Sequence, residues 1–185
     1  MTRTKIIILN GIGSAGKTSA AKELQKITKL PFLHIQGDSF LEMLPPRLFG
    51  HPDGIIFKQS GEDANASIEI QMGDAMTRLL SGFRHSVAAM ASHGNHLIVD
   101  DVMLEAADQE LYVAALSQFE LRFVALQAPL EILEQRERDR KDRLIGLARW
   151  QFDRVHLGIR YDLEIDTANM TSSEIAAQIA KAFEL

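Results

Sequence analysis

A glycine-rich segment near the start of the chain has the spacing of a phosphate-binding loop. Gly11–Thr18 matches the pattern G-x-x-x-x-G-K-[ST] at every fixed position. Glycines let the backbone turn tightly and point successive N–H groups inward at an anion. Lys17 would neutralise the β- and γ-phosphates of a nucleoside triphosphate, and Thr18 would offer its hydroxyl to Mg²⁺. The predicted phosphate-binding residues are Gly11, Gly13, Ser14, Ala15, Gly16, Lys17, Thr18 and Ser19.

The residues on either side of this loop provide the context that the pattern needs. An apolar, β-branched run over Lys5–Leu9 predicts a buried strand, and Ser19–Leu30 predicts a helix. A strand, a glycine loop and a helix in this order bind phosphate because the helix N-terminus adds its positive dipole end. The alternative is a glycine-rich turn with a chance Lys-Thr pair, and the context argues against it.

Two aspartates follow an apolar strand-like run further along the chain. Asp100 and Asp101 come directly after Leu97–Val99. An acidic residue that closes such a strand beside a phosphate-binding loop commonly helps to hold Mg²⁺, directly or through water. The alternative is a pair of turn-forming aspartates. The sequence predicts a magnesium role for at least one of them and does not decide which.

A third aspartate follows the strand-like run Phe32–Ile35. Asp38 should emerge at the same edge of the sheet as the glycine loop. A carboxylate there could orient an attacking hydroxyl and accept its proton during phosphoryl transfer. The alternative is that Asp38 or Ser39 caps a short helix over 40–44.

A dense group of arginines lies between residues 130 and 150. Arg136, Arg140 and Arg143 are spaced i, i+4 and i+7, so one continuous helix would place them on one face. As a lid over the triphosphate they could neutralise charge in the transition state. The alternative is a solvated helix with ordinary i,i+4 ion pairs, namely Glu134–Arg138, Glu137–Lys141 and Asp139–Arg143.

The remaining pattern predicts the fold. Strands alternate with helices, which indicates a parallel sheet with helices on both faces. The predicted strands are Lys5–Leu9, Phe32–Ile35, Leu97–Val99, Leu121–Leu126 and Leu163–Ile165. Apolar steps of three and four predict a long helix over Ile68–Met90, and a capping-box pattern at Thr171 predicts the last helix. Residues 45–67 have no clear period and predict a long irregular excursion, whose apolar content favours an ordered lobe that could line a pocket. The alternative is a plain surface insertion.

Composition limits the class of protein. A length of 185 residues suits a single domain, and a net charge of −5 argues against a broad nucleic-acid or membrane surface. The chain has no cysteine, which excludes disulfides and thiolate chemistry. No signal peptide or membrane span is expected, so a cytoplasmic enzyme is the default. His34 and His156 are interpreted as packing or edge residues, and the sequence leaves open whether the chain forms a homo-oligomer.

Taken together, these segments resemble the chloramphenicol phosphotransferase-like family of P-loop kinases. The segments that carry the resemblance are Gly13–Thr18, Gly37–Ser39 with Met43–Pro45, Leu97–Val102, Arg136–Arg143 with Ile145–Ala148, and His156 with Tyr161–Thr167. The resemblance implies a three-layer α/β/α P-loop fold with a five-stranded parallel sheet of nucleotide-kinase type. It also implies that Asp38 is the base for the acceptor hydroxyl and that the three lid arginines close on phosphates. Between Arg47 and Ser67, where the acceptor should bind, no family motif is found.

The leading hypothesis is an ATP- and Mg²⁺-dependent phosphotransferase that acts on a hydroxyl of a small molecule. Chloramphenicol, phosphorylated at its 3-hydroxyl, is the acceptor that the family resemblance suggests. A nucleotide or other metabolite kinase of the same fold is the first alternative. The second is a nucleotide-binding module that controls a partner and transfers no phosphate.

Overall fold

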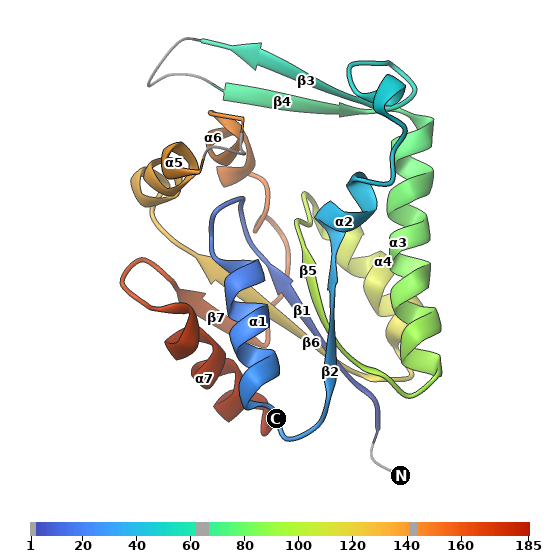
Figure 1. Ribbon diagram of the computed structural model, residues 1–185, viewed down its shortest axis with the longest axis vertical. Coiled ribbons are helices and arrows are strands. Elements are labelled where there is room, and N and C mark those ends of the chain that lie inside the picture. Colours follow the sequence, from blue (N-terminus) through green and yellow to red (C-terminus); the bar gives the residue numbers. More distant parts are fainter. Residues whose placement is uncertain (1–2, 62–66, 141–143) are drawn as a thin grey trace.

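Five parallel strands form the main sheet of the computed structural model, which describes residues 3–61, 67–140 and 144–185 (Figure 1). The strands are β1 (Lys5–Asn10), β2 (Phe32–Gln36), β5 (His96–Asp101), β6 (Glu120–Gln127) and β7 (Leu163–Asp166). Their order across the sheet is β2-β5-β1-β6-β7. The predicted three-layer fold and its five-stranded parallel sheet are confirmed.

Helices cover both faces of this sheet. On one face lie α1 (Lys17–Ile27) and α7 (Ser172–Phe183), and on the other lie α3 (Asp74–Ser92) and α4 (Ala106–Leu116) (Figure 1). Because side chains alternate along a strand, β1 sends Ile7 and Leu9 into the core under α1, and Ile6 and Ile8 into the core under α3 and α4. The predicted capping box at Thr171 is present at the start of α7. None of the helices in the described ranges is long and apolar enough to span a membrane.

The segment expected to be irregular, residues 45–67, contains regular structure. A short 3₁₀ helix, η1 (Pro46–Leu48), leads into β3 (Ile55–Ser60), which pairs antiparallel with β4 (Ser67–Met72). The expectation of an aperiodic loop was therefore wrong for the described part of the segment, and residues 62–66 lie outside it. The expected apolar packing is present, since Leu44, Ile55 and Met76 form a small core of their own.

The long helix predicted over Ile68–Met90 begins later, at Asp74. Ile68 and Met72 happen to continue the helical spacing of α3, but they belong to β4 and pair with β3. Gly73 lies between the two elements. Its backbone approaches the carbonyl oxygen of Pro52 so closely that a Cβ at this position would collide with that oxygen. The hairpin ladder therefore overrides the helical pattern at the start of this segment.

Three short helices stand at the carboxyl edge of the sheet: α2 (Gly37–Leu41), α5 (Leu130–Asp139) and α6 (Leu147–Phe152) (Figure 1). The helix predicted to carry all three lid arginines does not continue, because α5 ends at Asp139 and Arg140 has extended backbone angles (φ −90°, ψ 117°). Arg136 and Arg140 are therefore not on one continuous helical face. Arg143 lies outside the described residues.

Candidate active site

The glycine loop joins β1 to α1 and is shaped by two positive backbone angles. Ser14 has φ 69° and Gly16 has φ 95°, so the chain folds back on itself before the helix begins. Gly11 is packed so closely that a Cβ there would lie 2.5 Å from the carbonyl oxygen of Leu126. The first turn of α1 contains no acidic residue, so its positive dipole end is left available to an anion.

Lys17 lies at the base of this loop and is almost fully buried. Its Nζ donates to the carbonyl oxygens of Gly11 (2.7 Å) and Ile12 (3.3 Å). It is also 3.9 Å from Oδ1 of Asp100. Carbonyl oxygens and a nearby carboxylate are the partners that a buried ammonium needs, and they place Lys17 within the loop.

The two aspartates at the end of β5 point to opposite faces of the sheet. Asp100 shares a face with Ile98 and meets α1, where its Oδ2 accepts a 2.5 Å hydrogen bond from the Thr18 hydroxyl. Asp101 shares the other face with Val99, and its carboxylate accepts from the Tyr112 hydroxyl (2.7 Å) and from the Val102 N–H (2.8 Å). Strand alternation thus assigns Asp100 to the phosphate side and Asp101 to the α4 side.

The surroundings of Asp100 and Asp101 also shift the pKa values of the two carboxyls in opposite directions. Burial alone would raise the pKa of Asp100, but His34, Lys17 and Thr18 outweigh it and hold the pKa below its usual range. Burial raises the pKa of Asp101 despite its hydrogen bond from Tyr112. The ionised form is therefore favoured at Asp100, which faces the loop.

The oxygen ligands at this edge suit Mg²⁺. The Thr18 hydroxyl and the Asp100 carboxylate are hard oxygen donors, and in the described ranges no three His, Cys, Asp or Glu side chains form a metal-binding group. Magnesium usually takes one or two protein oxygens and completes its octahedron with phosphates and water. A Thr18–Asp100 pair beside a phosphate loop fits that pattern better than it fits a closed structural metal site.

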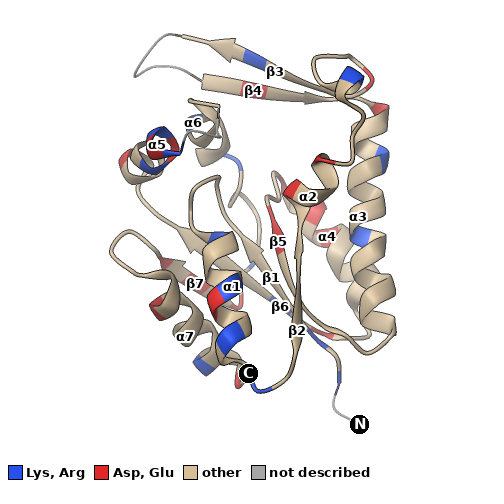
Figure 2. Ribbon diagram, viewed as in Figure 1, with Lys and Arg blue, Asp and Glu red and all other residues tan. Residues whose placement is uncertain are grey.

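Asp38 is exposed and lies within the first turn of α2, one residue after the helix begins. It is therefore not the N-cap of this helix. Gln36 occupies the cap position, and neither Asp38 nor Ser39 does. The start of α2 packs against the end of β5, since a Cβ on Gly37 would lie only 3.3 Å from Oδ1 of Asp101. Figure 2 shows the acidic residues of α2 and β5 together at this edge of the sheet.

The arginine segment is held by contacts that the sequence did not indicate. Arg136 donates to the Thr167 hydroxyl (3.2 Å), the Thr167 carbonyl (2.7 Å) and the Ala168 carbonyl (3.2 Å), so it ties α5 to the loop after β7. Glu137 is buried, and its carboxylate accepts from the N–H groups of Gly146 and Ala148 at the start of α6.

One of the predicted surface ion pairs, Glu134–Arg138, is replaced by another contact. Glu134 pairs with Arg149 at 2.6 Å, and Glu137 binds backbone amides. The third predicted pair, Asp139–Arg143, and the lysine at position 141 fall outside what the structure describes. The described part of the segment is thus a packed support for α6, and the solvated-helix alternative does not apply to Glu137.

Two buried side-chain amides that were not predicted from the sequence, Asn10 and Gln151, form hydrogen bonds at and next to the glycine loop. Asn10 accepts from the Met103 N–H (2.8 Å) and donates to the Val155 carbonyl (2.9 Å) and the Tyr161 hydroxyl (2.7 Å). Gln151 accepts from the Gly13 N–H at 2.8 Å. A polar Asn10 at the end of an apolar strand was a visible signal, whereas nothing in the sequence marks Gln151.

We expect Gln151→Leu to destabilise the protein by about 1–3 kcal/mol, because it leaves the Gly13 N–H without its acceptor. Urea unfolding measures this, with Gln118→Leu, a change at an exposed glutamine, as the matched control. Gln151→Glu restores an acceptor but adds negative charge beside the loop, so it should weaken ATP binding more than it lowers stability. Equal stability of Gln151→Leu and the wild type would contradict this role for Gln151.

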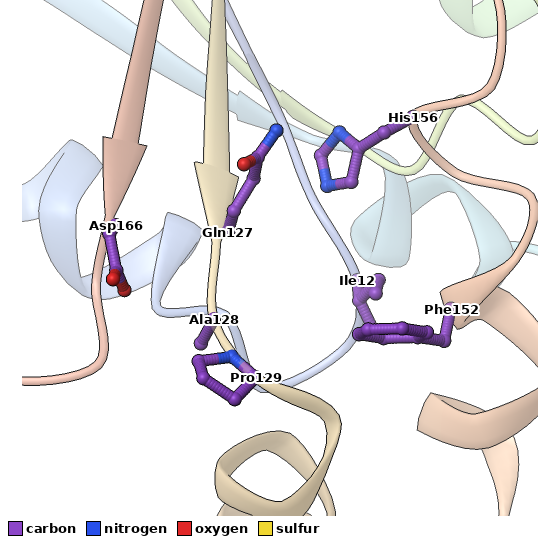
Figure 3. A pocket seen from close by; sticks show the side chains of 7 residues that line it. All are labelled: Ile12, Gln127, Ala128, Pro129, Phe152, His156 and Asp166. Atoms are coloured by element: carbon purple, nitrogen blue, oxygen red, sulfur yellow. The ribbon is translucent and has the colours of Figure 1, made fainter.

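A cavity of about 400 Å³ lies between the glycine loop and the ends of β6 and β7. Figure 3 shows its lining, with Ile12 of the loop and Phe152 on one wall and Gln127 and Asp166 on the other. His156 also lines it, with Nδ1 2.8 Å from the Tyr161 hydroxyl. That hydroxyl accepts from Asn10, and the acceptors within reach of its own proton are Nδ1 at 2.8 Å and the Val155 carbonyl at 3.5 Å.

Burial lowers the pKa of His156, so the imidazole binds its second proton less readily in the folded chain than in the unfolded chain. We therefore expect the free energy of unfolding to fall as pH falls below about 6.5, until the lowered pKa is reached. His156→Asn keeps an acceptor for Tyr161 and removes the titration. The loss of stability between about pH 7.5 and pH 5, followed by urea unfolding, should be smaller in this variant than in the wild type. His93→Asn, at an exposed histidine, should leave the loss unchanged.

Comparisons with known proteins find similar chains among phosphotransferases and kinases. Two Mycobacterium tuberculosis proteins, each named as a proposed O-phosphotransferase, are 28% identical to the chain over all of its length and 84% of theirs. The solved sugar kinase of a Janibacter species has a TM-score of 0.71 at 14% identity, with 98% of this chain and 95% of that one covered.

The solved Mycobacterium tuberculosis APS kinase in complex with AMPPNP and APS has a TM-score of 0.69 at 16% identity over the whole of both chains. Identities this low support the fold alone. The family model of the chloramphenicol phosphotransferase-like proteins matches residues 4–184, which is nearly the whole chain. The fold is thus that of a P-loop kinase, and the chain belongs to the chloramphenicol phosphotransferase-like family.

Proposed function

We propose that this kinase transfers the γ-phosphate of ATP to a hydroxyl group of a small molecule and requires Mg²⁺. The observation that carries the proposal is the meeting of three groups at one edge of the sheet. Lys17 lies in the glycine loop, Asp100 binds the Thr18 hydroxyl beside it, and Asp38 stands exposed at the end of the neighbouring strand. These are the parts that positioned phosphoryl transfer needs.

Each group has a defined task in this proposal. The loop amides and Lys17 bind the triphosphate, while Thr18 and Asp100 hold Mg²⁺, which would neutralise charge on the phosphates. Asp38 orients the acceptor hydroxyl and takes its proton as the oxygen forms a bond to the γ-phosphorus. The bond between that phosphorus and the oxygen bridging it to the β-phosphate breaks, and ADP leaves.

The arginines are proposed to complete the donor site. Arg140 and Arg143 would supply positive charge to the transferring phosphoryl group from the segment between α5 and α6. Arg136 would need to leave the carbonyls of Thr167 and Ala168 to reach a phosphate, so its contacts favour a role in fixing the loop after β7.

The apolar residues around the β3–β4 hairpin favour an acceptor with an apolar body. Phe57 and Ile70 pack on the small core that contains Leu44 and Ile55. Such a lobe suits chloramphenicol, the acceptor suggested by the family name, better than it suits a nucleotide, which needs polar contacts to its base edges.

The test is ADP release from ATP with a panel of acceptors. Stimulation by chloramphenicol supports amphenicol phosphorylation, whereas stimulation by nucleosides alone favours a nucleotide kinase. Slow hydrolysis that no alcohol accelerates would overturn the proposal in favour of a nucleotide-binding regulatory module.

A further inference from the structure

His34 is a buried histidine whose ring nitrogen has no ordinary structural explanation. Its side chain is 6% exposed, and its Nε2 has no hydrogen-bond partner in the part of the chain that the structure describes. Buried polar atoms without a partner are rare, because leaving one unpaired costs about 1–3 kcal/mol. An apolar residue would fill the same space at no such cost.

The nearest charged group to this nitrogen is the carboxylate that faces the glycine loop. His34 Nε2 lies 3.7 Å from Oδ2 of Asp100, the same oxygen that accepts the 2.5 Å hydrogen bond from Thr18. Lys17 approaches the other oxygen of Asp100 at 3.9 Å. Three side chains, Lys17 and Thr18 of α1 and His34 of β2, therefore converge on one buried carboxylate.

The strand register explains why His34 reaches this position. β2 and β5 are parallel neighbours, and His34 lies opposite Ile98, two residues before Asp100. Phe32 and Ile98 both belong to the core under α1, so the alternation of side chains sends His34 and Asp100 to that same face. Diagonal neighbours on one face of a sheet are within reach of a long or aromatic side chain.

Other interpretations of His34 fit less well. As a packing residue it would leave Nε2 buried with no interaction to compensate for the loss of water. As a direct ligand of Mg²⁺ it would offer nitrogen to an ion that prefers oxygen. A donor to Asp100 uses the buried nitrogen and also contributes to the low pKa of that carboxyl.

We propose that His34 is a positioning residue for the magnesium site, which presupposes the ATP- and Mg²⁺-dependent activity proposed above. From 3.7 Å, a polar contact longer than a hydrogen bond, its Nε2–H would hold Asp100 in the orientation in which Thr18 and Asp100 together bind the ion. Without that donor, the short side-chain contact to Oδ2 that remains among the described residues is the hydrogen bond from Thr18, and the carboxylate can turn about its χ angles. Residues that orient metal ligands in this way commonly change metal affinity by about 10–100-fold when they are replaced.

Calorimetric titration with ATP, once with Mg²⁺ and once with EDTA, tests the proposal without relying on turnover. His34→Phe removes the donor and keeps a planar ring, so it should weaken ATP binding roughly 10-fold or more with Mg²⁺ and leave binding in EDTA near the wild-type value. His34→Gln places an amide N–H close to the position of Nε2 and should restore most of the loss. His34→Asn is too short to reach Asp100 and should behave like His34→Phe.

The pattern across variants separates positioning from packing. An equal loss with Mg²⁺ and with EDTA, or wild-type behaviour of His34→Phe, overturns the proposal. If His34→Phe does not fold, His34→Gln and His34→Asn test the proposal, because these two side chains differ chiefly in length. Equal affinities of these two variants for ATP in the presence of Mg²⁺ would overturn the proposal. The readout is binding, so a wild-type protein that binds Mg²⁺ with ATP but transfers no phosphate contradicts the proposed function and leaves the role of His34 testable.

Discussion

Replacing Asp38 with alanine should lower turnover by roughly two to four orders of magnitude while ATP affinity stays near the wild-type value. A positioned acid or base contributes an effect of this size to phosphoryl transfer. Asp38 is exposed in the first turn of α2, whose N-cap position belongs to Gln36, so the predicted loss concerns turnover and not the start of the helix. Initial rates at saturating ATP, together with ATP titration, measure the two quantities separately.

Two further variants make the Asp38 prediction specific. Asp38→Asn keeps the shape of the side chain and removes the base, so it should resemble Asp38→Ala in turnover. Glu42→Gln changes an exposed carboxylate just beyond the same helix and should leave turnover unchanged. Wild-type turnover in Asp38→Asn would mean that the carboxylate serves α2 alone and that the proposed base is wrong.

Replacing Lys17 with methionine should reduce turnover by roughly two to three orders of magnitude, the usual effect of removing one preorganised group that stabilises transition-state charge. The methionine fills the buried space beneath the loop but supplies no charge to the phosphates. It also removes the cation 3.9 Å from Asp100, so the pKa of that carboxyl should rise. Turnover with saturating Mg²⁺ and ATP measures the first effect.

The matched control for Lys17 is Lys22→Met, an exposed lysine on the same helix. It has the same change in net charge and should leave turnover unchanged. Equal turnover in Lys17→Met and Lys22→Met would show that the loop binds phosphate without help from its lysine, contrary to the proposed role.

The sequence predicted the main sheet well because its central strands β1, β5 and β6 are buried on both faces and therefore contain continuous apolar runs. The β3–β4 hairpin is different, since it stands at the edge of the molecule and its strands end in polar residues such as Lys58 and Gln59. Ile68 and Met72 then matched the helical period of α3 by chance. The junction between the strand and the helix is held by contacts of Gly73 with Pro52 and Gly54, which lie about twenty residues earlier in the chain.

The candidate site was predictable where a local motif carried it and unpredictable where tertiary packing did. Gly11–Thr18 could be assigned from spacing alone, but the choice between Asp100 and Asp101 depended on which face of β5 meets α1. Gln151 and His34 reach the loop and Asp100 from distant parts of the chain, so no local pattern marks them.

The most direct test of phosphoryl transfer uses ATP labelled in its γ-phosphate, incubated with Mg²⁺, the protein and each acceptor that stimulates ADP release. The predicted result is label in a phosphate ester of the acceptor, formed in equal amount with ADP and lost in Asp38→Ala. Label found only in inorganic phosphate, at a rate that no acceptor changes, would contradict phosphoryl transfer to a small-molecule hydroxyl.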